Sequence, residues 1–109
     1  MQKQYRLKKK GTFQYVYRRG SSTACREMVL LYTKSRNIKI GFSVSKKVGN
    51  SVTRNLIKRR LRECFREQIG NIKGGNYVII ARPTILNISY SRLQQQIIYL
   101  LSKQDLFIK

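Results

Sequence analysis

The chain has 109 residues, and 41% of them are hydrophobic, which suits one domain with a single core. Its 24 Lys and Arg residues stand against only 4 Asp and Glu residues, so the net charge at pH 7 is +20. A compact domain with this charge repels itself unless a polyanion is near, so we expect a nucleic-acid partner. An anionic membrane is the rival partner, but no segment has the roughly 18 consecutive apolar residues of a span, and no signal peptide is visible.

The chain is poor in the residues that metal sites and hydrolytic sites use. Cys25 and Cys64 form no CxxC pair and there is no histidine, which argues against a zinc site and excludes a histidine general base. One possible bridge makes no disulfide scaffold, and we expect both thiols to be reduced, as in a cytoplasmic protein. The acidic residues are Glu27, Glu63, Glu67 and Asp105. Glu63 and Glu67 lie among arginines, which favours ordinary intrahelical ion pairing. We therefore assign no catalytic and no metal-binding residue.

Near the start of the chain, an aromatic segment predicts a short helix over residues 12–20. Phe13, Val16 and Tyr17 recur at the i, i+3, i+4 spacing of one helical face. Aromatic rings beside arginines are typical of surfaces that stack on unpaired nucleotides. Alternatively, Phe13 and Val16 only fill the core. We expect Tyr15 to point outward.

Two strands are predicted next. Residues 28–33 form a short apolar run, and residues 38–45 alternate strictly between two kinds of side chain. The apolar positions are Ile38, Ile40, Phe42 and Val44. The other positions are Lys39, Gly41, Ser43 and Ser45. The apolar set must pack on the core. The other face is small and hydroxylated and leaves room for a ligand, although a plain solvent-facing surface is the alternative.

The most basic segment predicts a helix over residues 51–68, capped by Asn50 or Ser51. With about 100° per residue, a buried stripe falls on Ile57, Leu61, Cys64 and Phe65. One flank carries Asn55, Lys58, Arg59, Arg62 and Arg66. The other flank carries Leu56, Arg60, Glu63 and Glu67. Because the charges are sorted by sign, we predict a phosphate-binding ridge and not merely a solvated face. The amide of Asn55 could read a base edge or a 2′-hydroxyl.

The last third of the chain predicts one strand and one helix. Residues 77–81 form a buried type of strand that ends before Pro83. Ser89 can cap a structural helix with apolar residues at helical spacing. These are Leu93, Ile97, Leu100 and Leu101. The element order indicates an α+β fold in which helices pack against a small sheet. We expect one domain over residues 1–109, with residues 1–10 as a basic, partly mobile arm.

The stretch "GFSVSKKVGNSVTRNLIKRRLRE", residues 41–63, resembles the signature of the bacterial ribonuclease P protein subunit. The segments "RLKKKGTFQYVYRRG" and "YVIIARP" follow in family order, so the resemblance covers nearly the whole chain. It implies an α/β sandwich with a small mixed sheet, the order α-β-β-β-α-β-α and a left-handed βαβ crossover, like one domain of a small-subunit ribosomal protein. It also implies a complex with a catalytic RNA that removes the 5′ leader of precursor tRNA, with Mg2+ serving RNA-based chemistry.

The resemblance also implies two sets of RNA-binding residues. The set for the catalytic RNA is Arg54, Asn55, Lys58, Arg59, Arg62, Arg66, Lys46 and Lys47. The set for the tRNA leader is Phe13, Tyr17, Ser43 and Ser45, with Tyr32 as a further candidate. Two departures stand out: Tyr17 stands where phenylalanine is common, and Ser51 replaces a usual alanine and should cap its helix at least as well. The connection after Tyr32 is short.

Three other functions are compatible with the residues alone. The chain could be a structural RNA-binding protein of the ribosomal type, without a role in cleavage. It could be a stand-alone nuclease, although the small number of carboxylates argues against this. It could also bind specific DNA sequences. We expect neither a membrane nor a small-molecule substrate.

Overall fold

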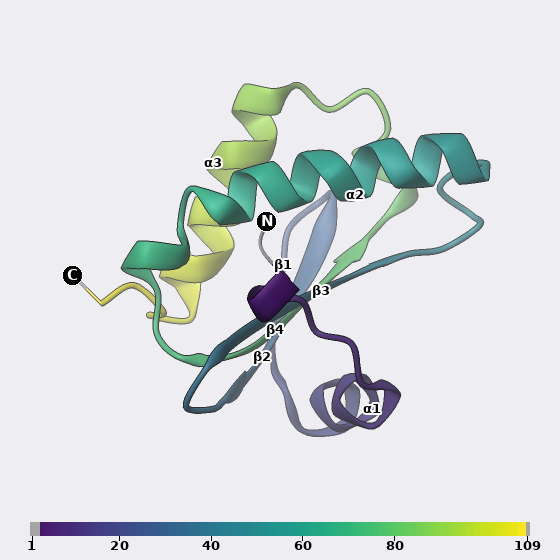
Figure 1. The fold of residues 1–109 in the computed structure, drawn as a ribbon. Helices are drawn as coiled ribbons and strands as arrows, with labels where there is room; N and C mark the ends of the chain where they lie inside the picture. Colours follow the sequence, from purple (N-terminus) through teal and green to yellow (C-terminus); the bar gives the residue numbers. More distant parts are fainter. Residues whose placement is uncertain (1–2, 109) are drawn as a thin grey trace.

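The computed structural model describes residues 3–108, which form three α-helices and a four-stranded sheet (Figure 1). The helices are α1 (Lys10–Arg19), α2 (Ser51–Arg66) and α3 (Tyr90–Lys103). The strands are β1 (Ser21–Ala24), β2 (Met28–Lys34), β3 (Ile38–Val44) and β4 (Gly75–Ala81). Short 3-10 turns lie at Lys3–Tyr5, Ile69–Asn71 and Pro83–Ile85. The predicted α+β class and the order α-β-β-β-α-β-α are confirmed.

The strands lie in the order β1-β2-β4-β3. β2 pairs antiparallel with both β1 and β4, whereas β3 pairs parallel with β4. Parallel neighbours need a crossover connection, and α2 provides it as predicted. Among the four strands, β1 is the one whose residues the sequence did not locate, because "SSTA" is too short and too polar to show a strand pattern.

Helices cover both faces of the sheet. α2 and α3 lie on one face, and α1 lies on the other (Figure 1). The larger core lies beneath α2 and α3 and has Phe65 and Tyr77 at its centre, both fully buried. The smaller core lies beneath α1, where Val16 packs against Leu31 and Val78. β2 and β4 therefore bury side chains on both faces, which explains their continuous apolar sequences.

The caps fix where α2 and α3 begin. Asn50 has an extended backbone, and its Oδ1 accepts a hydrogen bond from the N–H of Thr53 at 2.9 Å. Of the two predicted caps, Asn50 is therefore confirmed and Ser51 is wrong, because Ser51 is already the first helical residue. Ser89 caps α3 as predicted, accepting from the N–H of Arg92 at 3.1 Å.

The N-terminal arm packs along β3. The backbone N–H of Leu7 donates to Ile40 O at 3.0 Å, and the Leu7 side chain is buried against the core beneath α1. Residues 1–2 of the arm predicted over residues 1–10 lie outside the described residues. The packed part brings the lysines that precede α1 close to the edge of the sheet.

Candidate nucleic-acid interface

The orientation of α2 is set by its apolar stripe. All four predicted stripe residues are buried: Ile57, Leu61, Cys64 and Phe65. The Phe65 ring contacts Phe42 of β3 and Tyr77 of β4, with centroids 5.9 and 6.2 Å away. With this stripe held on the sheet, the two flanks of α2 must face different surroundings.

The cationic flank of α2 is the set Asn55, Lys58, Arg59, Arg62 and Arg66, and it faces the β3 edge of the sheet. Lys58 and Arg62 line a shallow hollow that also contains Phe13 and Gly41. Asn55, Arg59 and Arg66 are exposed. Within residues 3–108, Arg66 is the only member with an ion pair, to Glu63 at 2.7 Å. The flank is therefore largely unneutralised by the protein.

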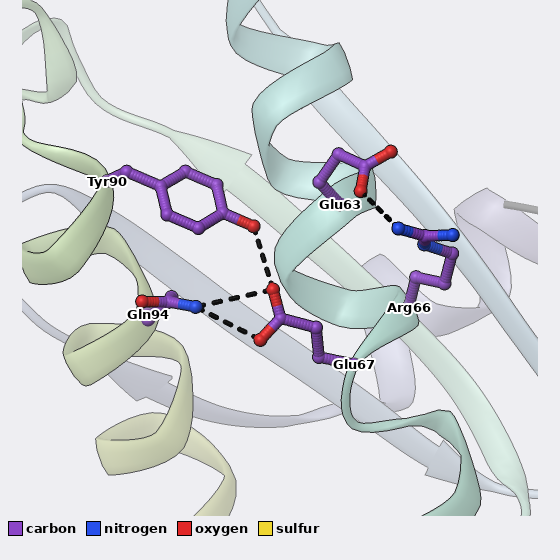
Figure 2. A network of polar contacts seen from close by, with 5 residues as sticks. All are labelled: Glu63, Arg66, Glu67, Tyr90 and Gln94. Atoms are coloured by element: carbon purple, nitrogen blue, oxygen red, sulfur yellow. Dashed lines mark hydrogen bonds and ion pairs between the residues drawn. The ribbon is translucent and has the colours of Figure 1, made fainter.

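The opposite flank of α2 is tied to α3 (Figure 2). The carboxylate of Glu67 accepts a hydrogen bond from the Tyr90 hydroxyl at 2.8 Å and from Gln94 Nε2 at 3.0 Å. This hydrogen bond raises the pKa of Tyr90, because a phenolate would stand beside the carboxylate. Glu63 makes the predicted ion pair within the helix, but Glu67 makes its contacts between helices.

The aromatic face of α1 docks on β3 through a glycine. A Cβ atom at Gly41 would lie 2.6 Å from Phe13 Cε1, so a larger residue there would displace the ring. Phe13 is half-buried and Val16 is fully buried, as the core-filling alternative predicts. The Tyr17 ring lies 6.4 Å from that of Phe13 and is 44% exposed. Tyr15 is 52% exposed and points outward as predicted.

Beside α1, part of the sheet face stays partly open. Thr12 lines a hollow with Lys39 and Asn76, so this flank of α1 faces their side of the sheet. Phe13 and Tyr17, about 100–140° further round the helix, face the other side. The sheet row there contains Ser43, Ile80 and Val29, all half-buried. We call these five residues, Phe13, Tyr17, Ser43, Ile80 and Val29, the aromatic surface.

Sequence reasoning missed Val29 and Ile80. Both belong to strands that are apolar on both faces, so alternation gave no signal for a ligand-facing side. Ser45, the remaining predicted serine, is exposed directly after β3.

Tyr32, the further candidate for leader binding, lies on the other face of the sheet from this surface. Side chains alternate along β2, so Tyr32 faces α2 and α3 while its neighbour Leu31 faces α1. Its ring lies 5.0 Å from that of Tyr77, and its hydroxyl donates to Gly74 O at 2.6 Å. Burial raises its pKa. Tyr32 is a structural residue of the larger core.

The remaining predicted RNA-binding residues lie near the start of α2. Lys46 and Lys47 are exposed in the turn between β3 and α2. Arg54 is half-buried one turn before Lys58, at the border between the buried stripe and the cationic flank. Its Nε is buried without a hydrogen-bond partner among the described residues.

The described residues contain no group of three or more His, Cys, Asp and Glu side chains that could hold a metal ion. Both cysteines are free, and burial raises the pKa of the Cys64 thiol to about 11. Within residues 3–108, no helix is long and apolar enough to cross a membrane.

A sheet with a tilted pair of aromatic rings beside one edge and a one-signed cationic helix flank at that edge defines an α+β nucleic-acid-binding domain. Comparison with known proteins gives the family. The family model "Ribonuclease P" matches residues 1–105. The ribonuclease P protein component of Geobacillus kaustophilus is 44% identical over 108 residues, which cover 94% of this chain and 88% of that protein. That of Staphylococcus carnosus is 39% identical, covering 100% of this chain and 97% of that protein.

Solved structures agree. The ribonuclease P protein of Staphylococcus aureus superimposes with a TM-score of 0.84 and 35% identity, covering 100% of this chain and 96% of that chain. The chain therefore belongs to the ribonuclease P protein family.

Proposed function

We propose that this chain is the protein subunit of ribonuclease P, binding the catalytic RNA and the 5′ leader of precursor tRNA. It assists the Mg2+-dependent removal of the leader by an endoribonuclease in which the RNA carries the chemistry. One observation supports this most directly. The cationic flank of α2 and the aromatic surface beside α1 meet at the β3 edge, where Lys58 and Arg62 share a hollow with Phe13.

The cationic flank, together with Arg54, Lys46 and Lys47, binds the catalytic RNA in this proposal. Its exposed guanidinium groups suit phosphate oxygens, since each planar fork can grip two of them. The amide of Asn55 can reach a base edge or a 2′-hydroxyl. On the opposite flank Glu67 is engaged with α3, so the cationic flank is the side of α2 on which we expect the RNA.

The aromatic surface and Ser45 bind the leader in this proposal. A leader is unpaired, so its bases are free to stack on aromatic rings, and Tyr17 presents an exposed ring. The leader would lie on the hydroxyl of Ser43 and on the apolar side chains of Ile80 and Val29. The leader would therefore run beside the catalytic RNA and not across the same contacts.

Mg2+ would be held mainly by RNA phosphates, because the carboxylates of this chain do not fit a metal site. Each is engaged in a protein contact: Glu27 with Arg92, Glu63 with Arg66, Glu67 with Tyr90, and Asp105 with Lys73. We expect residues 1–109 to act as one RNA-binding domain in the cytoplasm, where the thiols of Cys25 and Cys64 stay reduced.

The test is cleavage of precursor tRNA at low Mg2+ by the catalytic RNA, with and without this protein. We expect the protein to raise the cleavage rate or the affinity for the substrate. If neither changes, the chain is an RNA-binding protein without a role in cleavage. Protein rigorously freed of RNA serves as the control, and we expect it to be inactive.

A further inference from the structure

The loop that joins β4 to α3 runs beside the first half of α2 (Figure 1), and an apolar hollow lies between them. The volume of this apolar hollow is about 220 Å³. Neither the cationic flank nor the aromatic surface contributes a residue to its lining. The proposed function therefore leaves it without a role.

The apolar hollow has a buried floor and an exposed rim. The floor consists of Ile57, Ile85 and Leu93, each at most 7% exposed. Leu56 of α2 and Leu86 of the loop form the rim and are exposed. Val52 is also exposed and precedes Leu56 by four residues, so it extends the same side of the helix. A continuous apolar surface of this kind is typical of a docking site.

The loop that walls the apolar hollow is held by local contacts. The N–H of Ile88 donates to Ile85 O at 3.2 Å. Between them, Asn87 has a φ of 65°, which asparagine adopts more readily than most residues. The hydroxyl of Thr84 donates to Arg26 O at 2.5 Å and anchors the start of the loop. A partner can therefore bind here with little rearrangement of the backbone.

One cation stands at the apolar hollow. Arg60 follows Leu56 by one turn of α2, is exposed, and has no ion pair within residues 3–108. The other residues of the lining are apolar or uncharged. The acids further along this flank are engaged elsewhere, Glu63 with Arg66 and Glu67 with α3. An apolar hollow beside an unneutralised arginine complements an apolar side chain with a carboxylate next to it.

The size and chemistry of the apolar hollow select the kind of occupant. Small-molecule sites usually have roughly 300–1,000 Å³, so a smaller hollow suits one or two side chains of a protein. Among the residues that line it, none is aromatic, so a nucleotide base finds no ring to stack on. Its concave shape does not suit a membrane surface, which requires a wide apolar face. A second copy of the chain also carries a net charge of +20, which opposes its approach.

We propose that the apolar hollow docks an acidic segment of a partner protein. The segment inserts one or two aliphatic side chains over Ile57 and Ile85 and places a carboxylate at Arg60. The cationic flank stays free, so the chain can hold the catalytic RNA and this partner at the same time. This inference goes beyond the proposed function and does not depend on it.

Residue-resolved NMR titration of the full chain, at physiological salt, tests the docking with a short acetylated peptide of leucines and glutamates. We expect saturable shifts of the methyl signals of Leu56, Leu86 and Ile88. A matched peptide with serines for the leucines should bind about fivefold or more weakly at these signals, because it buries no apolar side chain. One with glutamines for the glutamates should bind about two- to fivefold more weakly, the effect of a lost exposed ion pair.

Two matched pairs of variants assign the binding to the apolar hollow. Leu86→Ser should raise the dissociation constant of the leucine–glutamate peptide, read from Leu56, by about fivefold or more. Ile98→Ser changes a similarly exposed apolar residue of α3 and should leave it unchanged. Arg60→Gln should raise it by about two- to fivefold, whereas Arg59→Gln, on the cationic flank, should not.

Shifts that do not saturate overturn the proposal, as do equal dissociation constants within either pair of variants. Anionic lipid vesicles, oligouridylate and dilution of the protein alone are measured in parallel. If one of these moves the same methyl signals and the peptide does not, the hollow belongs to a membrane, to RNA or to a second copy, and the proposal is wrong.

Thermal unfolding of Leu86→Ser should match that of the unsubstituted protein, and Arg60→Gln gives a reading that does not depend on the loop. Binding of the catalytic RNA by Arg59→Gln tests the proposed function separately. Weakened RNA binding there without peptide docking refutes only this inference. Peptide docking with RNA binding unchanged in Arg59→Gln counts against the proposed function alone.

Discussion

At the scale of single residues, Gly41 sets the position at which α1 packs on the sheet. The small, hydroxylated face of β3 was predicted to leave room for a ligand, and the space above Gly41 is in fact taken by the Phe13 ring of the same chain. The predicted room remains beside it, at Ser43 and Ser45. A single missing side chain therefore sets the position of the ring that we propose for leader binding.

The first prediction concerns this contact. Gly41→Ala should displace the Phe13 ring and lower the free energy of unfolding by about 1 kcal/mol, because a well-packed site tolerates extra volume poorly. In a Phe13→Leu background the same change should cost clearly less, since the two positions are in contact. Urea unfolding of the four proteins measures this coupling. Equal costs in both backgrounds would show that the ring does not depend on Gly41.

Glu27 is the buried acid of this chain, at 6% exposure. Arg92 Nε donates to it at 3.0 Å and Gln96 Nε2 at 3.1 Å, so it ties the start of β2 to α3. Burial alone would raise the pKa of this carboxyl. The hydrogen bonds from Arg92 and Gln96, with the Arg92 charge, outweigh burial and hold the pKa below its ordinary value of 4.5.

This lowered pKa predicts a pH-dependent contribution to stability. A carboxyl with a lower pKa in the folded state stabilises the fold above its unfolded pKa, and this stabilisation is lost as the pH falls through the folded pKa. Glu27→Gln should therefore cost about 1–2 kcal/mol at pH 7 and less at about pH 3. Urea unfolding at both pH values measures it. The exposed control Glu63→Gln should cost little at either, and a Glu27→Gln cost that does not change with pH contradicts the account.

At the scale of elements, α2 has three sides: a stripe buried on the sheet, a cationic flank at the β3 edge and a flank that contacts α3. Its stripe and both flanks could be predicted from the sequence, because the helical period alone fixes which residues share a side. The residues that contact each flank could not be predicted from the sequence. The packing of α2 against α3 brings Tyr90 and Gln94 to Glu67. The same limit applies to Tyr32, whose side of the sheet could not be predicted. Alternation shows which residues of β2 face together, but not which helix covers each face.

The sidedness of α2 gives a prediction about RNA binding, from two neighbouring arginines. Arg59 belongs to the cationic flank, whereas Arg60 lines a hollow with Leu56 and Leu86 on the opposite flank. Arg59→Ala should weaken binding of the catalytic RNA and reduce the slope of log affinity against log salt by about 0.9, the loss of one phosphate contact. Arg60→Ala should leave the slope unchanged. Equal effects of both would mean that charge alone, without sidedness, drives binding.

At the scale of the whole molecule, the edge strand β3 gathers segments that are far apart in the sequence. The N-terminal arm pairs with it, Phe13 rests on it, and α2 carries Lys58 and Arg62 along it. Composition and periodicity predicted each segment but not their meeting. The resemblance to the ribonuclease P protein subunit implied two sets of RNA-binding residues but not their position at one edge, where β3 pairs in parallel with β4. The two proposed RNA surfaces thus lie side by side on one small domain.

The most direct measurement is the affinity of the reconstituted ribonucleoprotein for precursor tRNA and for tRNA without a leader. We predict that Tyr17→Leu weakens binding of precursor tRNA by about fivefold or more, the effect of one lost stacking contact, and leaves leaderless tRNA unaffected. Tyr15→Leu, which removes an outward-pointing ring from the same helix, should change neither affinity. If Tyr17→Leu behaves like Tyr15→Leu, or weakens both substrates equally, the aromatic surface does not hold the leader.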